Sequence, residues 1–111
     1  MTDGLKRKYV RIPSDLIVRI TNRHMSDSTR MELEKITNIS MGGVLIETKM
    51  PFPEGSIVEM QFTIPGSNKQ VAAKGVVKWA NDGSMTDRPV GMGVEFISMS
   101  RVDRSSISEF V

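Results

Sequence analysis

Residues 58–64 read Val-Glu-Met-Gln-Phe-Thr-Ile, with an apolar side chain at every second position. A period of two is the spacing of a β-strand that buries one face and exposes the other. Pro65-Gly66 follows directly. This pair favours a tight turn, because proline suits its first central position and glycine accepts positive φ at the second. The stretch therefore predicts a half-buried strand that ends in a turn.

Similar alternation recurs before and after this strand, separated by turn-forming residues. Further strands are predicted at residues 16–21, 31–38, 44–48, 71–79 and 90–96, with the polar residues 22–30 as a hairpin tip. Several short strands at this spacing are typical of an antiparallel sandwich or barrel, and a closed barrel leaves no strand edge exposed.

The last segment changes period and predicts a short helix. Ser100-x-x-Asp103 has the spacing of an N-terminal capping box, with aspartate in place of the usual glutamate or glutamine. Behind it, the apolar side of the helix would pack on the sheet through Val102, Ile107, Phe110 and Val111.

Length and composition indicate one globular domain. The 111 residues are 39% hydrophobic and 25% charged, and they contain no cysteine. The missing cysteines exclude disulfides, thiolate zinc sites and a cysteine nucleophile, and they fit a reducing cytoplasm.

No apolar run is long enough for membrane insertion, and no secretory signal is visible, so a cytoplasmic location is expected. A net charge of +2 is too small for a general polyanion binder.

The positive charge is concentrated near the N-terminus, where Lys6, Arg7, Lys8 and Arg11 fall within six residues. Proline at 13 disfavours a helix before it, so this segment should enter the fold as extended or turn-like chain. Two arginines four residues apart share a face in an extended chain, about 13 Å apart, and also in a helical turn, about 6 Å apart. Their planar forks suit phosphate oxygens and the O6/N7 edge of guanine. Alone, such a cluster is more often a solvated basic tail than a binding site.

A second motif, Asn38-x-Ser40-x-x-Gly43, lies at the end of a predicted strand. The Asn38 amide and the Ser40 hydroxyl can read base edges. Gly43 lets the backbone approach a ligand or take positive φ. The same residue types are also ordinary turn formers.

The order of these features resembles the PilZ domain family. Arg7-x-x-x-Arg11 comes first and Asn38-x-Ser40-x-x-Gly43 second, and the similarity continues through residues 75–79, 91–96 and 103–110. The resemblance implies a six-stranded antiparallel Greek-key barrel with a short C-terminal helix. It also implies a receptor for cyclic di-GMP in which Arg7 and Arg11 contact phosphates and guanines, while Asn38, Ser40 and Gly43 contact the ligand from the barrel surface.

Other positions add to this expected site. Many family members have aspartate where this chain has Asn38, and an amide lacks the charge-assisted bond of a carboxylate to guanine N–H groups. The resemblance also implies that the position of Lys6 influences whether one or two ligand molecules bind, and Lys8 and Gly93 are further candidates for ligand contact. Trp79 is either a packing residue or an aromatic wall for a guanine.

The expected organisation is a flexible basic ligand-binding segment at residues 1–12 and a barrel with its helix at residues 13–111. The segment would fold over cyclic di-GMP and change the surface offered to an unidentified effector protein in trans. No enzymatic activity, cofactor or metal site is expected. The only histidine, His24, lies in a polar loop without a visible nucleophile or further metal ligands.

Two other functions remain open. One is a PilZ-like adaptor that does not bind nucleotide and acts through protein contacts alone. The other is a small barrel that binds single-stranded RNA or DNA, but such sites need a basic groove with several exposed aromatic residues. The chain has one Trp, one Tyr and four Phe, and most Phe occupy core-facing positions, so no DNA or RNA partner is expected.

Overall fold

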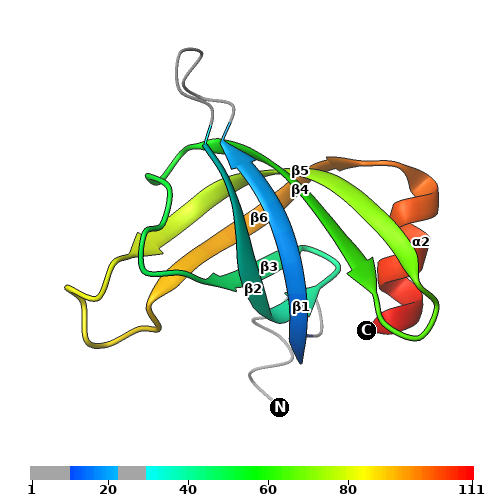
Figure 1. Ribbon diagram of the computed structural model, residues 1–111, viewed down its shortest axis with the longest axis horizontal. Coiled ribbons are helices and arrows are strands. Elements are labelled where there is room, and N and C mark those ends of the chain that lie inside the picture. The colour runs from blue at the N-terminus through cyan, green and yellow to red at the C-terminus, as the bar shows by residue number, and fades with distance from the viewer. Residues whose placement is uncertain (1–10, 23–29) are drawn as a thin grey trace.

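Six antiparallel strands form a closed barrel within residues 11–22 and 30–111, the part of the chain that the computed structural model describes. One helix follows the barrel (Figure 1). The elements are β1 (Arg11–Asn22), β2 (Arg30–Ser40), β3 (Gly43–Glu47), β4 (Ile57–Ile64), β5 (Lys69–Asn81), β6 (Gly91–Met99) and α2 (Arg101–Phe110). Within this part of the chain, no helix is long and apolar enough to cross a membrane.

The strand order around the barrel is β1-β2-β3-β6-β5-β4. The first three strands are sequential neighbours, whereas β4 pairs with β1 and β6 pairs with β3. The connection from β3 to β4, residues 48–56, therefore crosses to the other side of the barrel. Strands β1, β2, β4 and β5 extend beyond the ranges expected from the sequence, whereas β3 is shifted by one residue and β6 begins one residue later and ends three residues later. The predicted Greek-key barrel with a C-terminal helix is confirmed.

The barrel interior is filled by the apolar positions of the alternating strands. In β4 all four apolar residues of the 58–64 stretch are buried, and Val18 and Ile20 of β1 face them across the β1–β4 pair. Phe52, from the connection between β3 and β4, is also fully buried. Burying a side chain of this size stabilises the fold by about 2–3 kcal/mol.

In β2 the expected alternation fails before Ile36. Leu33 is 66% exposed because it lies opposite the outward-facing Arg19. The inward position is Glu34, opposite Val18, and its carboxylate accepts a hydrogen bond of 2.8 Å from the Thr48 hydroxyl. This hydrogen bond satisfies a charged group at a position that the other strands fill with apolar side chains.

Helix α2 begins as predicted and docks on β5 through its first turn. Ser100 is the N-cap and accepts a hydrogen bond from the Asp103 backbone N–H. The Asp103 carboxylate accepts from the backbone N–H of Ala72, just beyond the end of the β5–β6 pairing. Ile107 is fully buried, but Val102 is 72% exposed, so the prediction that it belongs to the packed side was wrong.

Candidate functional site

The two sequence motifs meet where β1 begins and β2 ends. Arg11 is the first residue of β1, and its backbone pairs with Ser40, the last residue of β2. Pro13 pairs with Asn38 two residues further along β1. The second arginine of the first motif therefore starts the strand that lies beside the second motif. β1 thus begins two residues before the expected boundary at Pro13.

Several predicted site residues lie outside the described residues. These are Lys6, Arg7 and Lys8, and the single histidine, His24, lies outside them as well. Arg11 is described by its backbone position alone. The geometry below therefore concerns the barrel side of the expected site.

The Ser40 hydroxyl holds the turn between β2 and β3. It accepts hydrogen bonds from the backbone N–H groups of Gly42 (3.1 Å) and Gly43 (3.3 Å), and it donates to the Gly43 carbonyl oxygen (3.4 Å). Ser40 is buried. Its immediate role in this arrangement is to satisfy backbone donors at the break between two strands.

Gly43 allows β3 to approach β6 closely. A side chain at this position would overlap the Val94 carbonyl oxygen, and the next contact, to the Glu95 Cα, would be only 3.1 Å. Next to it, the carbonyl oxygen of Gly42 accepts a hydrogen bond of 2.9 Å from the backbone N–H of Phe96 on β6. Gly43 is not among the glycines with positive φ. The sequence offered two roles for Gly43, positive φ and close approach of the backbone to a ligand. The structure shows a close approach, but to the neighbouring strand β6.

Asn38 carries an unsatisfied polar atom. Its Oδ1 is buried and accepts no hydrogen bond in the described part of the chain. A buried acceptor without a donor costs about 1–3 kcal/mol. Such an atom in a native fold needs an explanation, and a donor supplied by a ligand is one.

A row of cross-strand neighbours connects Asn38 to Trp79 over the outside of the barrel. Asn38 pairs with Leu45, Leu45 with Gly93, and Gly93 with Trp79. Directly opposed residues of neighbouring strands present their side chains on the same face. Leu45 lies between the buried residues Val44 and Ile46, so the face of this row is the outer one. We call Asn38, Leu45, Gly93 and Trp79 the outer row.

Two irregularities in the strands place Asn38 and Trp79 in the outer row. The register shifts between Ile36 and Asn38 in the β2–β3 pair, and between Val77 and Trp79 in the β5–β6 pair. Ile36 and Val77 are buried, so regular alternation would turn the residues two positions later inward as well. The extra residue of a β-bulge reverses this orientation, and bulges commonly re-aim side chains beside functional sites.

Gly93 provides the space that the Trp79 ring occupies. A Cβ at position 93 would overlap the indole Nε1 and lie 2.7 Å from Cε2 and 2.8 Å from Cδ1. The indole therefore lies directly against the backbone of β6. An aromatic ring over a strand glycine shields backbone that would otherwise be exposed. Trp79 remains partly exposed, so its ring packs on the strand and still presents an aromatic surface to solvent.

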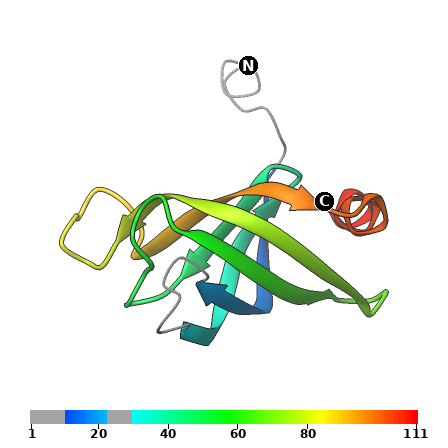
Figure 2. The same cartoon turned by 90° about the horizontal axis from the view of Figure 1, so that it is seen from above.

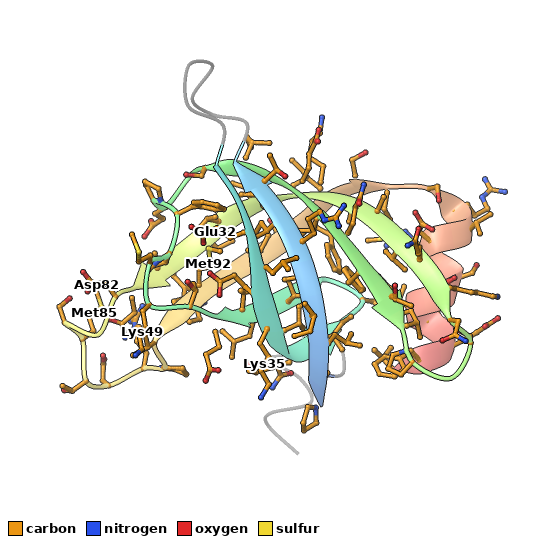
Figure 3. All side chains as sticks on the ribbon, in the orientation of Figure 1. Glu32, Lys35, Lys49, Asp82, Met85 and Met92 are labelled. Carbon is orange, nitrogen blue, oxygen red and sulfur yellow. The ribbon has the colours of Figure 1, made fainter. Side chains whose placement is uncertain are left out.

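A shallow groove lies beside the loop that follows β5. Lys49, Phe52, Asp82 and Ser84 are among its lining residues, and Figure 3 shows Lys49, Asp82 and Met85 at the end of the molecule where this loop projects. Hydrogen bonds from the backbone and the side chain of Ser84 hold the pKa of Asp82 below its ordinary value of 3.8. Of the predicted ligand-binding residues that the structure describes, none lines this groove.

Acidic and imidazole groups do not form a metal centre in the described ranges. Among residues 11–22 and 30–111, no group of three or more histidine, aspartate or glutamate side chains could hold a metal ion. Two cationic groups of the described residues lie next to Trp79. The Arg88 Cζ lies 5.9 Å from the Trp79 ring centroid, and Lys78, the residue before Trp79, pairs with Glu95 at 3.9 Å. Arg88 was not singled out from the sequence, because it lies in a loop far along the chain from either motif.

Comparison with known proteins identifies the fold and the family. The PilZ domain model matches residues 5–111. The structure is similar to the Bacillus subtilis inhibitor of motility MotI/DgrA, with a TM-score of 0.71 and 22% identity over 95% of this chain and 48% of that one. It is also similar to the PilZ domain of CeSA from a cellulose-synthesizing bacterium, with a TM-score of 0.64 and 18% identity over 92% of this chain and 94% of that one. The chain thus spans about half the length of the Bacillus protein. The comparison with curated proteins yields no match.

Proposed function

The chain belongs to the PilZ domain family, and we propose on that basis that it is a receptor for cyclic di-GMP that signals to a partner protein in trans. The observation that carries the proposal is the register of β1 and β2. The pairing of Arg11 with Ser40 and of Pro13 with Asn38 brings the strand that begins with the arginine motif alongside the second motif.

The chemistry of the two motifs fits the ligand. Cyclic di-GMP is a dianion with two guanine bases. Arg7 and Arg11 can bind its phosphate oxygens or the O6/N7 edge of guanine through paired N–H donors. The buried Oδ1 of Asn38 lacks a donor in the described part of the chain, and the N–H groups of a guanine edge would supply one. Ser40 and Gly43 act by holding the turn that presents Asn38.

The proposed mechanism is an ordering of the N-terminal segment. In this mechanism the residues that precede β1 fold over the bound nucleotide and dock beside residues 38–43, which changes the surface that the protein presents. The free energy for this change comes from ligand contacts made only in the docked state. A receptor of this kind needs no catalytic group, so we propose a binding function without enzymatic activity.

Titration calorimetry with cyclic di-GMP tests the proposal. Wild type is compared with the double variant Arg7→Ala/Arg11→Ala and with the control Arg101→Ala/Arg104→Ala. The control removes the same charge from exposed positions on α2. We expect wild type and control to bind at micromolar ligand and the Arg7/Arg11 variant to lose binding. Absence of binding by wild type, or equal binding by all three proteins, would overturn the proposal.

The alternative function is a PilZ-type adaptor that does not bind nucleotide. One observation favours it: the Ser40 hydroxyl is already engaged by two backbone donors and one acceptor, so it can serve the turn alone. Neutral Asn38 is also a weaker ligand for guanine than aspartate. A pull-down with and without cyclic di-GMP separates the two functions, because a receptor captures its partner in a ligand-dependent way and an adaptor does not.

A further inference from the structure

Arg88 and Trp79 form a contact at the edge of the outer row. The Arg88 Cζ lies 5.9 Å from the centroid of the Trp79 ring. This distance is near the outer limit of a favourable cation–π interaction. The guanidinium therefore stays close to the aromatic surface but is not tightly bound to it.

The position of Arg88 is fixed by a buried asparagine. Asn81 is 2% exposed and lies at the end of β5. Its Nδ2 donates to the carbonyl oxygens of Met85 (2.9 Å), Arg88 (3.0 Å) and Pro89 (3.1 Å). Its Oδ1 accepts from the N–H groups of Gly83 (3.1 Å) and Met85 (3.0 Å). One side chain thus organises the whole loop between β5 and β6, including the backbone of Arg88.

Among the described residues, the ion pair that Arg88 makes is a weak one. Its Nε lies 3.7 Å from the Asp87 carboxylate, but Asp87 is 77% exposed and Arg88 is 42% exposed. Ion pairs between exposed side chains contribute little, typically below about 1 kcal/mol. A planar cation that is weakly paired, and held over an aromatic ring, has the properties of a site for an anionic group or a guanine edge.

We propose that Arg88 is a third ligand-binding arginine of the cyclic di-GMP site and that Asn81 is the residue that positions it. This inference rests on the proposed function. The outer row connects Asn38 through Leu45 and Gly93 to Trp79, so Arg88 lies at the end of the row opposite Asn38. It donates to a phosphate oxygen or to guanine O6 and N7 of a nucleotide that lies along the row. Arg88 belongs to neither sequence motif.

The test is calorimetric titration of wild type, Arg88→Ala, Arg88→Lys and Arg101→Ala with cyclic di-GMP. Arg101 is the matched control, because it is exposed and lies on α2, at the opposite end of the molecule from the loop between β5 and β6 (Figure 2). Loss of a charge-assisted contact should weaken binding by Arg88→Ala about 10- to 100-fold. Arg88→Lys should restore only part of the binding affinity, because lysine keeps the charge but lacks the planar guanidinium group. Arg101→Ala should bind like wild type.

The possible results distinguish failure of the Arg88 proposal from failure of the proposed receptor function. If wild type does not bind, the receptor function fails and the role of Arg88 fails with it. If wild type binds and Arg88→Ala weakens binding no more than Arg101→Ala does, the receptor function stands and the third arginine is excluded.

A double-mutant cycle tests the positioning role of Asn81. If Asn81 acts by holding Arg88, Asn81→Ala should weaken binding in wild type but add nothing in the Arg88→Ala background. Additive losses in the double variant would contradict the role. Circular dichroism and thermal unfolding identify the variants that retain the barrel, and only the affinities of those variants enter the double-mutant cycle. If Asn81→Ala does not fold, Asn81→Asp replaces it: a carboxylate keeps the acceptor for Gly83 and Met85 but loses the donor to the Arg88 carbonyl.

Discussion

The indole of Trp79 lies against the backbone of Gly93, in the space that a Cβ at position 93 would fill. Two features of the chain produce this contact. The bulge after Val77 turns Trp79 to the outside of the barrel. Gly93 on β6 has no side chain, so the ring can lie directly on its backbone. The contact fixes an aromatic surface at one end of the outer row, next to the guanidinium of Arg88.

Gly93→Ala should therefore displace the Trp79 ring. The added methyl group would lie 2.7 Å from Cε2 and 2.8 Å from Cδ1, and overpacking of this kind costs about 1–3 kcal/mol. We expect a lower midpoint of thermal unfolding, a changed emission spectrum of this single tryptophan, and weaker binding of cyclic di-GMP.

Removal of the ring provides the control for this prediction. In the Trp79→Ala background the methyl group meets no indole, so the Gly93→Ala change should cost little further stability. An equal loss of stability in both backgrounds would mean that the glycine is required for a reason other than the ring.

Asn38→Asp should strengthen ligand binding and lower the stability of the ligand-free protein. A carboxylate makes charge-assisted bonds to guanine N–H groups, which predicts an affinity roughly tenfold higher. Without ligand, the charge would occupy a position where the buried Oδ1 has no donor in the described part of the chain, so the unfolding temperature should fall. Calorimetry and thermal unfolding measure the two effects.

Asn38→Leu is the matched control for this trade-off. Leucine has the same number of side-chain heavy atoms and the same branch at Cγ but no polar atom, so it removes the unsatisfied acceptor. The free protein should be as stable as wild type or more stable, while binding should be reduced. Unchanged affinity of Asn38→Leu would show that the amide makes no ligand contact.

Ser40→Ala should destabilise the protein and also weaken binding. The substitution leaves the N–H groups of Gly42 and Gly43 without their acceptor, at a cost of about 1–3 kcal/mol. Ser100→Ala removes the N-cap of α2, costs about 1 kcal/mol, and lies away from the outer row. Both variants should unfold at lower denaturant concentration, but only Ser40→Ala should bind cyclic di-GMP less tightly. Equal affinities would limit Ser40 to a purely structural role.

The barrel follows from the sequence because alternation and burial agree along most of the chain. Val58, Met60, Phe62 and Ile64 alternate without interruption, and all four are buried. The turn after them contains Gly66 at a φ of 87°, as the Pro-Gly pair predicts. The N-cap at Ser100 was equally readable, because a serine before a helical period has a direct hydrogen-bonding role.

The outer row does not follow from the same rule. Counting by twos from the buried Ile36 and Val77 turns Asn38 and Trp79 toward the core, and only the two bulges reverse this. A bulge depends on how neighbouring strands pair around the closed barrel, which no local pattern contains. Asn81 lies beyond the strand predicted at residues 71–79, and its five hydrogen bonds across residues 83–89 depend on the folded path of the following loop.

A nuclear magnetic resonance titration of the ¹⁵N-labelled protein with cyclic di-GMP tests most directly whether the outer row is the nucleotide site. The account predicts that the backbone amides of Asn38, Leu45 and Gly93 and the indole N–H of Trp79 shift together, saturating at one ligand concentration, while the amides of α2 (Arg101–Phe110) stay in place. Shifts confined to α2, or no shifts at millimolar ligand, would contradict it.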